Sequence, residues 1–191
     1  DRLTFALEEG MDAALFSIDE RTGEIMTANE GFNFESRDTY FFKISVTDGH
    51  EGTELLRSDM MRVVVQDVND PPEFSANKGL LVILPEITSL QGDSIYDVTN
   101  LASDEDNDAI TYKLYSDFAS STLSPDFEVV YDAETERSNI VVKRDTSAES
   151  GSPFDFENNS DNSWILSMTV SDGTDEVGPI EIALRLENVN E

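Results

Sequence analysis

The chain has 191 residues, with 12 lysines and arginines against 41 aspartates and glutamates, and its formal net charge at pH 7 is −29. This charge excludes generic binding to nucleic acids and to anionic membranes, because both need a basic surface, and the absence of cysteine excludes disulfide scaffolds, zinc–thiolate sites and thiol catalysis. A hydrophobic content of 38% is too high for a disordered acidic tail, so we expect a folded protein that favours cationic partners, metal ions above all.

Strand-like alternation dominates the chain. From the N-terminus onward, apolar residues alternate with other residues over positions 3–7, 40–47 and 61–66. A period of two places one set of side chains on a buried face and the other toward water, so Met61, Val63 and Val65 are expected to face inward. No segment carries a sustained apolar stripe of 3.6-residue period, and we expect little helix. Turn signals separate the strands, at Thr22-Gly23, Asp48-Gly49, Pro71-Pro72 and Asp172-Gly173. This pattern predicts an all-β protein built from antiparallel sandwiches.

The second half of the chain repeats the first. Four segments recur in the same order, namely residues 1–7 with 108–114, 32–35 with 154–157, 40–49 with 164–173, and 67–70 with 188–191. Such recurrence indicates two copies of one unit, which we predict over residues 1–70 and 71–191. Pro71-Pro72 stops a strand and stiffens the crossing between the copies.

The two copies differ at their front ends and in their loops. The second copy carries an extra stretch, 75–107, in which residues 80–83 and 95–98 are predicted to be strands. The first copy has no counterpart of this stretch, so we expect it to lack its opening strand. The second copy also has longer loops at 116–125 and 145–153, which are rich in serine and aspartate and are expected to be exposed.

Acidic residues recur where the predicted strands end and loops gather. Calcium takes six to eight oxygen ligands from carboxylates, amide groups and backbone carbonyls. The spacings Asp67-x-Asn69-Asp70 and Asp104-x-Asp106 allow a turning backbone to aim several oxygens at one point. The alternative for each segment is an acidic turn that is only solvated.

The segment Asp67-Val68-Asn69-Asp70-Pro71-Pro72-Glu73-Phe74 is similar to the linker signature of cadherin repeats. Phe16-Ser17-Ile18-Asp19 leading to Thr22-Gly23-Glu24-Ile25 resembles the same family, as does the strand that ends in Val46-Thr47-Asp48-Gly49. The resemblance covers nearly the whole chain, as most of one repeat and then a complete second. It implies two tandem Greek-key β-sandwiches of seven strands each, the first without its opening strand. It also implies up to three calcium ions at the junction between the repeats.

The resemblance further implies the calcium ligands, which come from both repeats. For the junction inside this chain they are Asn33, Glu35, Asp67, the carbonyl of Val68, Asn69, Asp70, Asp104, Asp106, a backbone carbonyl near Asn107 or Asp108, and Asp172. Residues matching ligands of adjacent junctions are Asp1, Asp48, Glu86, Asp155, Glu157 and the segment 188–191.

Three departures from the family pattern affect this junction. Pro71 follows Asp70 directly, where the family usually has Asn, so the linker is one residue short. Asn33 replaces a carboxylate, which should weaken the site it serves, and the first copy lacks the opening-strand glutamate, which weakens or removes the outermost ion. The ligand set still contains six carboxylates, whose six negative charges equal the charge of three calcium ions: Glu35, Asp67, Asp70, Asp104, Asp106 and Asp172. Without metal, two unit charges ~4 Å apart repel by roughly 1 to 4 kcal/mol, so we expect a junction that is loose without calcium and stiff with it.

The function that the resemblance implies is that of calcium-binding extracellular repeats in a cell-surface adhesion or receptor protein, anchored by a single membrane pass. Expected partners are calcium, other cadherin repeats of the same chain and a homophilic or heterophilic protein, with no nucleic acid and no membrane insertion by this segment.

Asn158 starts a glycosylation sequon, Asn158-Asn159-Ser160. The chain opens with Asp1-Arg2 and no signal-peptide pattern, so we expect it to come from a longer protein.

Two other functions are weighed against this one. The polar loops of the second copy favour a cadherin-like surface module that binds polysaccharide or another extracellular ligand. An acidic hydrolase could use a carboxylate pair, but with 41 acids some pair always lies at a suitable distance. The only histidine, His50, lies beside no marked serine nucleophile. We therefore expect no enzymatic activity.

Overall fold

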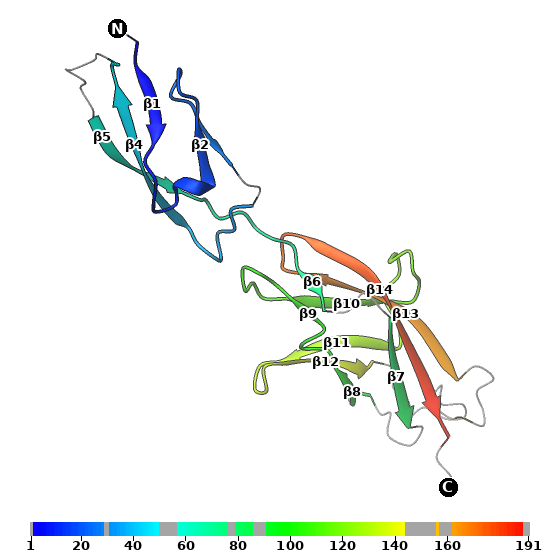
Figure 1. Cartoon of the computed structure of the whole chain (residues 1–191). Coiled ribbons are helices and arrows are strands. Elements are labelled where there is room, and N and C mark those ends of the chain that lie inside the picture. The colour runs from blue at the N-terminus through cyan, green and yellow to red at the C-terminus, as the bar shows by residue number, and fades with distance from the viewer. Residues whose placement is uncertain are drawn as a thin grey trace. The chain divides into compact units, whose positions relative to one another are not determined.

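The computed structural model describes residues 2–28, 31–49, 57–75, 79–85, 91–143, 156 and 162–188. The chain forms two compact units, Asp1–Val68 and Asn69–Glu191, whose strands are labelled in Figure 1. Within the described residues, helical structure is limited to the single 3-10 turn η1 (Ala13–Leu15), and no helix has the length and apolar character needed to span a membrane. The predicted all-β class is confirmed.

The first unit is built from two small antiparallel sheets. One sheet has the order β1-β4-β5 and consists of β1 (Thr4–Leu7), β4 (Thr39–Thr47) and β5 (Arg57–Val64). The other is the hairpin of β2 (Phe16–Ile18) and β3 (Ile25–Thr27). Strands β1, β4 and the second half of β5 lie where the alternating pattern of the sequence predicted strands. That pattern did not predict β2, β3 or the start of β5 at Arg57.

The turn between β2 and β3 shows why the sequence has Thr22-Gly23 there. The backbone N–H groups of Arg21 and Thr22 each donate to Oδ1 of Asp19 at 2.8 Å, and these hydrogen bonds lower the pKa of the Asp19 carboxyl. Gly23 has a φ of +72°, and a Cβ added to it would lie 3.1 Å from the ring of Phe5. Glycine is therefore required for both the backbone conformation and the close approach.

Seven strands of the second unit form a sandwich of two sheets, with the orders β10-β13-β14-β7 and β11-β12-β8. These strands are β7 (Leu80–Pro85), β8 (Ser94–Asp97), β10 (Thr111–Tyr115), β11 (Phe127–Asp132), β12 (Arg137–Val142), β13 (Ser163–Ser171) and β14 (Glu176–Glu187). A short pair, β6 (Glu73–Phe74) with β9 (Ala102–Ser103), lies where the chain enters this unit. The strands predicted in the extra stretch of the second copy are β7 and β8.

The core of the second unit lies between its two sheets. Ile182 and Leu184 of β14 are fully buried, and they belong to one apolar cluster with Leu166 of β13 and with Phe127 and Ile140 of the opposite sheet. Complete burial of a side chain of this size stabilises the fold by about 1.5 to 3 kcal/mol. This core gives the loops at the ends of the strands a rigid support.

The first unit has a smaller core and a more open sheet. In the second unit β7 pairs in parallel with β14, with Leu80 opposite Ile182. In the described part of the first unit, β5 pairs only with β4.

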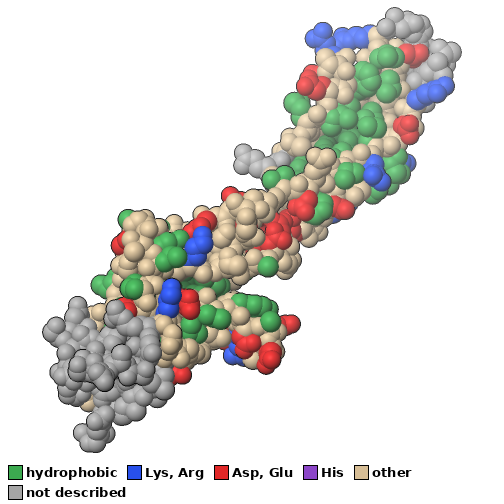
Figure 2. Space-filling model, turned by 180° about the vertical axis from the view of Figure 1, so that it is seen from behind, with side chains coloured by type: hydrophobic (Ala, Val, Ile, Leu, Met, Phe, Trp, Pro, Cys, Tyr) green, Lys and Arg blue, Asp and Glu red, His purple; other side chains and the backbone are tan. Residues whose placement is uncertain are grey.

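The open edge changes the burial of β5. Val63 and Val65 pack against the buried Phe16 and Phe42, as their positions predicted. Met61 is 38% exposed, so its predicted inward burial was wrong, because among the described residues no strand beyond β5 covers it. Figure 2 shows hydrophobic side chains gathered on one face of this unit.

Candidate metal centre

The segment that enters the second unit is tied to two loops of that unit. The backbone N–H of Asp70 donates to Oδ2 of Asp106 at 2.7 Å. The Asn69 side-chain Nδ2 donates to Oδ2 of Asp172 and to Oδ2 of Asp175, both at 3.0 Å. These hydrogen bonds connect Asn69 and Asp70, the first two residues of the second compact unit, to the rest of that unit.

The loop between β9 and β10 gathers three carboxylates. Oxygen atoms of Asp104, Asp106 and Asp108 lie within 4.8 Å of one another. The loop is shaped by Asn107, whose φ of +62° is a left-handed conformation that asparagine tolerates better than most residues. The backbone N–H of Asp108 donates to Oδ1 of Asp104 at 3.1 Å, which closes the turn.

One carboxylate oxygen in this loop has no hydrogen-bond donor. Oδ2 of Asp104 is buried, and no described residue donates to it. A buried polar atom left unsatisfied costs about 1 to 3 kcal/mol, and more when it is charged. The arrangement therefore leaves an acceptor for a cation.

The turn between β13 and β14 presents Asp172 as an ionised carboxylate. Hydrogen bonds from the Asn69 side chain and then from the backbone N–H groups of Asp175 and Thr174 lower the pKa of Asp172. Both backbone groups donate to Oδ1 at 2.6 Å, so this oxygen is fixed in place. The side chain is thus charged at neutral pH and cannot rotate freely.

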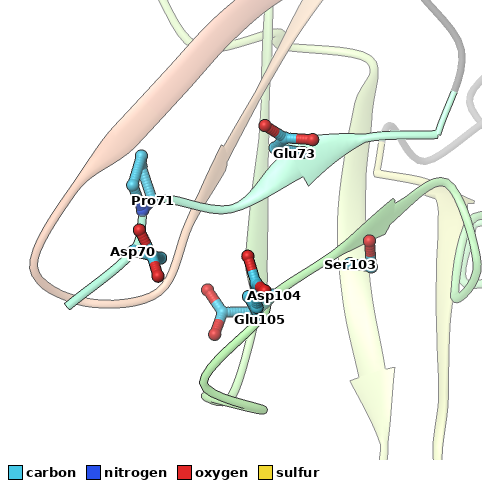
Figure 3. A pocket seen from close by; sticks show the side chains of 6 residues that line it. All are labelled: Asp70, Pro71, Glu73, Ser103, Asp104 and Glu105. Atoms are coloured by element: carbon cyan, nitrogen blue, oxygen red, sulfur yellow. The ribbon is translucent and has the colours of Figure 1, made fainter. Parts of the chain in front are cut away.

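A cavity of about 280 Å³ opens beside the loop between β9 and β10, next to the β6–β9 pair. Figure 3 shows the Asp70 side chain across the cavity from those of Asp104 and Glu105. The lining residues are Asp70, Pro71, Glu73, Ser103, Asp104 and Glu105. The acidic walls make this a place for a cation rather than for an apolar ligand.

The donor set fits a hard divalent cation. The clustered groups offer carboxylate and amide oxygens, which is the ligand type that calcium prefers. None of the ion pairs formed by the described residues includes Asp104, Asp106, Asp108 or Asp172, so lysine and arginine do not neutralise them in this way. The buried Oδ2 of Asp104, to which no described residue donates, is an acceptor that such a cation would satisfy.

The predicted ligands of the first unit lie in loops and at strand ends. Asn33 is half-buried, and its Oδ1 accepts a hydrogen bond from the backbone N–H of Ser36 at 2.6 Å. Glu35, Asp67 and Val68 are exposed, the last by 76%. Asp48, a predicted ligand of an adjacent junction, lies half-buried just after β4.

The structure thus brings together six of the predicted residues in the second unit, namely Asn69, Asp70, Asp104, Asp106, Asp108 and Asp172. The remaining predictions fall outside the described residues, and they concern Asp1, Glu86, Asp155, Glu157, Asn158 and the segment 189–191.

Asp175 is a residue of this site that sequence reasoning missed. Its side chain accepts a hydrogen bond from Asn69, and its backbone donates to Asp172. The only signal in the sequence is a second aspartate three residues after Asp172, in a turn that contains Gly173. Aspartates are common in such turns, so this signal alone could not have identified it.

Comparison with curated proteins places the chain among cadherins. It is 33% identical to rat protocadherin Fat 2 over an alignment of 140 positions that covers 70% of this chain and 3% of that protein. It is 22% identical to mouse cadherin-9 over an alignment of 198 positions that covers 99% of this chain and 23% of that protein. The chain thus spans less than a quarter of either relative. No protein-family model matches it.

Solved structures with the same fold are extracellular cadherin domains. Domains 1–2 of human protocadherin-24 match with a TM-score of 0.68 at 17% identity, covering 98% of this chain and 83% of that one. Domains 3–6 of protocadherin gamma B2 match with a TM-score of 0.67 at 19% identity, covering 99% of this chain and 40% of that one. Fold and sequence relatives agree, and the chain belongs to the cadherin repeat family.

Proposed function

We propose that this chain binds calcium where two consecutive cadherin repeats join, and that the bound metal stiffens the ectodomain of a cell-surface adhesion or receptor protein. The observation that carries the proposal is the buried Oδ2 of Asp104, which no described residue partners, in a loop that gathers three carboxylates. We assign the two repeats to residues 1–70 and 71–191. Bound calcium would supply positive charge and shared coordination to carboxylates that otherwise repel one another.

The residues of the chain have distinct roles in this proposal. Asp104, Asp106 and Asp172 hold the metal from the second repeat, with Asp108 contributing from the same loop. Asn69 and Asp70 contribute from the linker. The hydrogen bonds from Asn69 to Asp172 and from Asp70 to Asp106 support this role. From the first repeat, Glu35, Asp67 and the carbonyl of Val68 complete the set of up to three ions, with Asn33 as a weak ligand.

The wider setting of the proposal is the cell surface. Calcium sites of extracellular modules have dissociation constants of about 10⁻⁴ to 10⁻³ M, which suits the calcium concentration outside cells. We propose that the chain lies in the extracellular part of a single-pass membrane protein, that Asn158 carries a glycan, and that a homophilic or heterophilic protein is the adhesive partner. The role is binding and structural rather than catalytic, in line with the cadherin relatives.

Thermal melting with calcium and with chelator tests this function. A ligand present at ten times its dissociation constant stabilises the folded state by about 1.4 kcal/mol per site, so calcium should raise the melting temperature by several degrees. Asp70→Ala should remove most of the rise, because it deletes a carboxylate but keeps the backbone N–H that donates to Asp106.

The control is Glu134→Gln, which removes one negative charge from the exposed turn between β11 and β12. It should leave the calcium-dependent rise unchanged. Equal melting temperatures of the unaltered chain in calcium and in chelator would contradict the proposed function.

A further inference from the structure

The orientation of the Asn69 side chain is fixed by two carboxylates. Its Nδ2 lies 3.0 Å from an oxygen of Asp172 and 3.0 Å from an oxygen of Asp175, with a longer contact of 3.5 Å to the carbonyl of Asp70. Carboxylates and carbonyls are acceptors only, so the group that faces them must be the amide nitrogen with its two hydrogens.

The amide oxygen of Asn69 is consequently turned away from these acceptors. Within the described part of the chain, no N–H or O–H group donates to it. An amide oxygen is a calcium ligand, whereas an amide nitrogen is not. The two aspartates therefore set Asn69 in the one orientation in which its oxygen is available to a metal.

Asp172 and Asp175 both accept a hydrogen bond from Asn69, but they differ in their other contacts. Asp172 belongs to the predicted ligand set and is held by two backbone N–H groups. Asp175 is exposed, and its side chain is connected to the site through Asn69. Its carboxylate is thus in contact with the amide of Asn69.

We propose that Asp175 is a positioning residue of the calcium site, which holds the Asn69 amide nitrogen so that the amide oxygen coordinates the metal. The inference rests on the proposed function, because it concerns the same site. Groups that orient metal ligands typically contribute about 10-fold to 100-fold to metal affinity. The role needs only an acceptor atom at position 175, and an asparagine there would still supply one.

Calcium titration calorimetry on the whole chain tests this inference with two variants. Asp175→Ala removes the acceptor and should weaken calcium binding about tenfold, whereas Asp175→Asn keeps an acceptor oxygen and should bind nearly as tightly as the unaltered chain. Glu134→Gln serves as the charge-matched control and should not change the affinity. Melting in chelator shows whether each variant is folded.

Terbium luminescence separates a positioning role from direct ligation. Lifetimes in H₂O and in D₂O give the number of waters on Tb³⁺, used here in place of Ca²⁺. A positioning residue predicts the same number in Asp175→Asn as in the unaltered chain. If both variants bind equally weakly and gain a water, Asp175 is itself a ligand and the inference is wrong.

The remaining outcomes separate the two proposals. If the unaltered chain binds calcium and Asp175→Ala binds it equally well, the positioning role is overturned while the proposed function stands. If the unaltered chain shows no calcium binding in the titration, the proposed function fails and the inference fails with it.

Discussion

At the level of individual residues, Asp12 and Arg37 of the first unit form an ion pair. The guanidinium donates to both carboxylate oxygens of Asp12, at 2.7 and 2.5 Å, and also lies 4.4 Å from the centre of the Tyr40 ring. Oδ2 of Asp12 accepts a further hydrogen bond from the backbone N–H of Phe41 at 2.8 Å. The hydrogen bonds from Arg37 and then from Phe41 lower the pKa of Asp12. This pair attaches the loop before η1 to strand β4.

This lowered pKa predicts a dependence of stability on pH. The unfolded-chain pKa of Asp is about 3.9, and the folded value is lower, so the stabilising contribution of Asp12 is present above about pH 4 and is lost as the pH falls through the folded value. Asp12→Asn should lower the melting temperature of the first unit at pH 7 and reduce its decline as the pH falls below about 4. Melting curves in chelator check this, with Glu9→Gln, a change at an exposed acid, as control. Equal pH profiles for Asp12→Asn and the unaltered chain would contradict it.

The acidic residues that the fold brings together in the second unit could be named from the sequence as candidate ligands, because they lie in short motifs such as Asp104-x-Asp106. The contact between Asn69 and Asp175 could not, because 106 residues separate them and only the fold brings them together. The left-handed conformation of Asn107, which shapes the loop, also has no clear signal in the sequence.

Among the strands, comparison of the two units shows how one additional strand changes the burial of side chains on its neighbour. Strand β13 aligns with β4 residue for residue, with Trp164 at the place of Tyr40, and each pairs with a later strand in an antiparallel register. Ile182 on β14 lies opposite Leu166, and Met61 on β5 lies opposite Phe42, so the two positions are equivalent. Ile182 is fully buried beside β7, whereas Met61 is 38% exposed.

Matched truncations at these two positions test the effect. Ile182→Ala should lower the free energy of unfolding of the second unit by about 2 to 5 kcal/mol, because it leaves a cavity in a packed core. Met61→Ala should cost less than about 1 kcal/mol, because the methionine is already 38% exposed in the folded chain. Denaturant unfolding followed for each unit measures both values. Equal losses at the two positions would show that β7 does not account for the difference in burial.

The elements themselves were largely predictable. A period of two located β1, β4 and the second half of β5, and the internal repeat predicted β10 and β13 from their counterparts. Burial along β5 was not predictable, because alternation indicates which side chains share a face and not whether another strand covers that face.

For the whole molecule, the dominant property is a net charge of −29, part of which is concentrated in the loops of the candidate metal centre. Composition alone predicted a cationic partner, and the motifs predicted calcium. The spatial relation between Asp104, Asp106, Asp172 and the linker depends on the packing of β9, β10, β13 and β14, and so required the fold.

Small-angle X-ray scattering of the whole chain, in about 2 mM calcium and in chelator, tests the central claim most directly. If calcium joins the two repeats, the profile in calcium should fit one narrow set of arrangements of the units, and the profile in chelator should require a broad set. Asp70→Ala in calcium should scatter like the unaltered chain in chelator. Superimposable profiles of the unaltered chain under the two conditions would contradict the account.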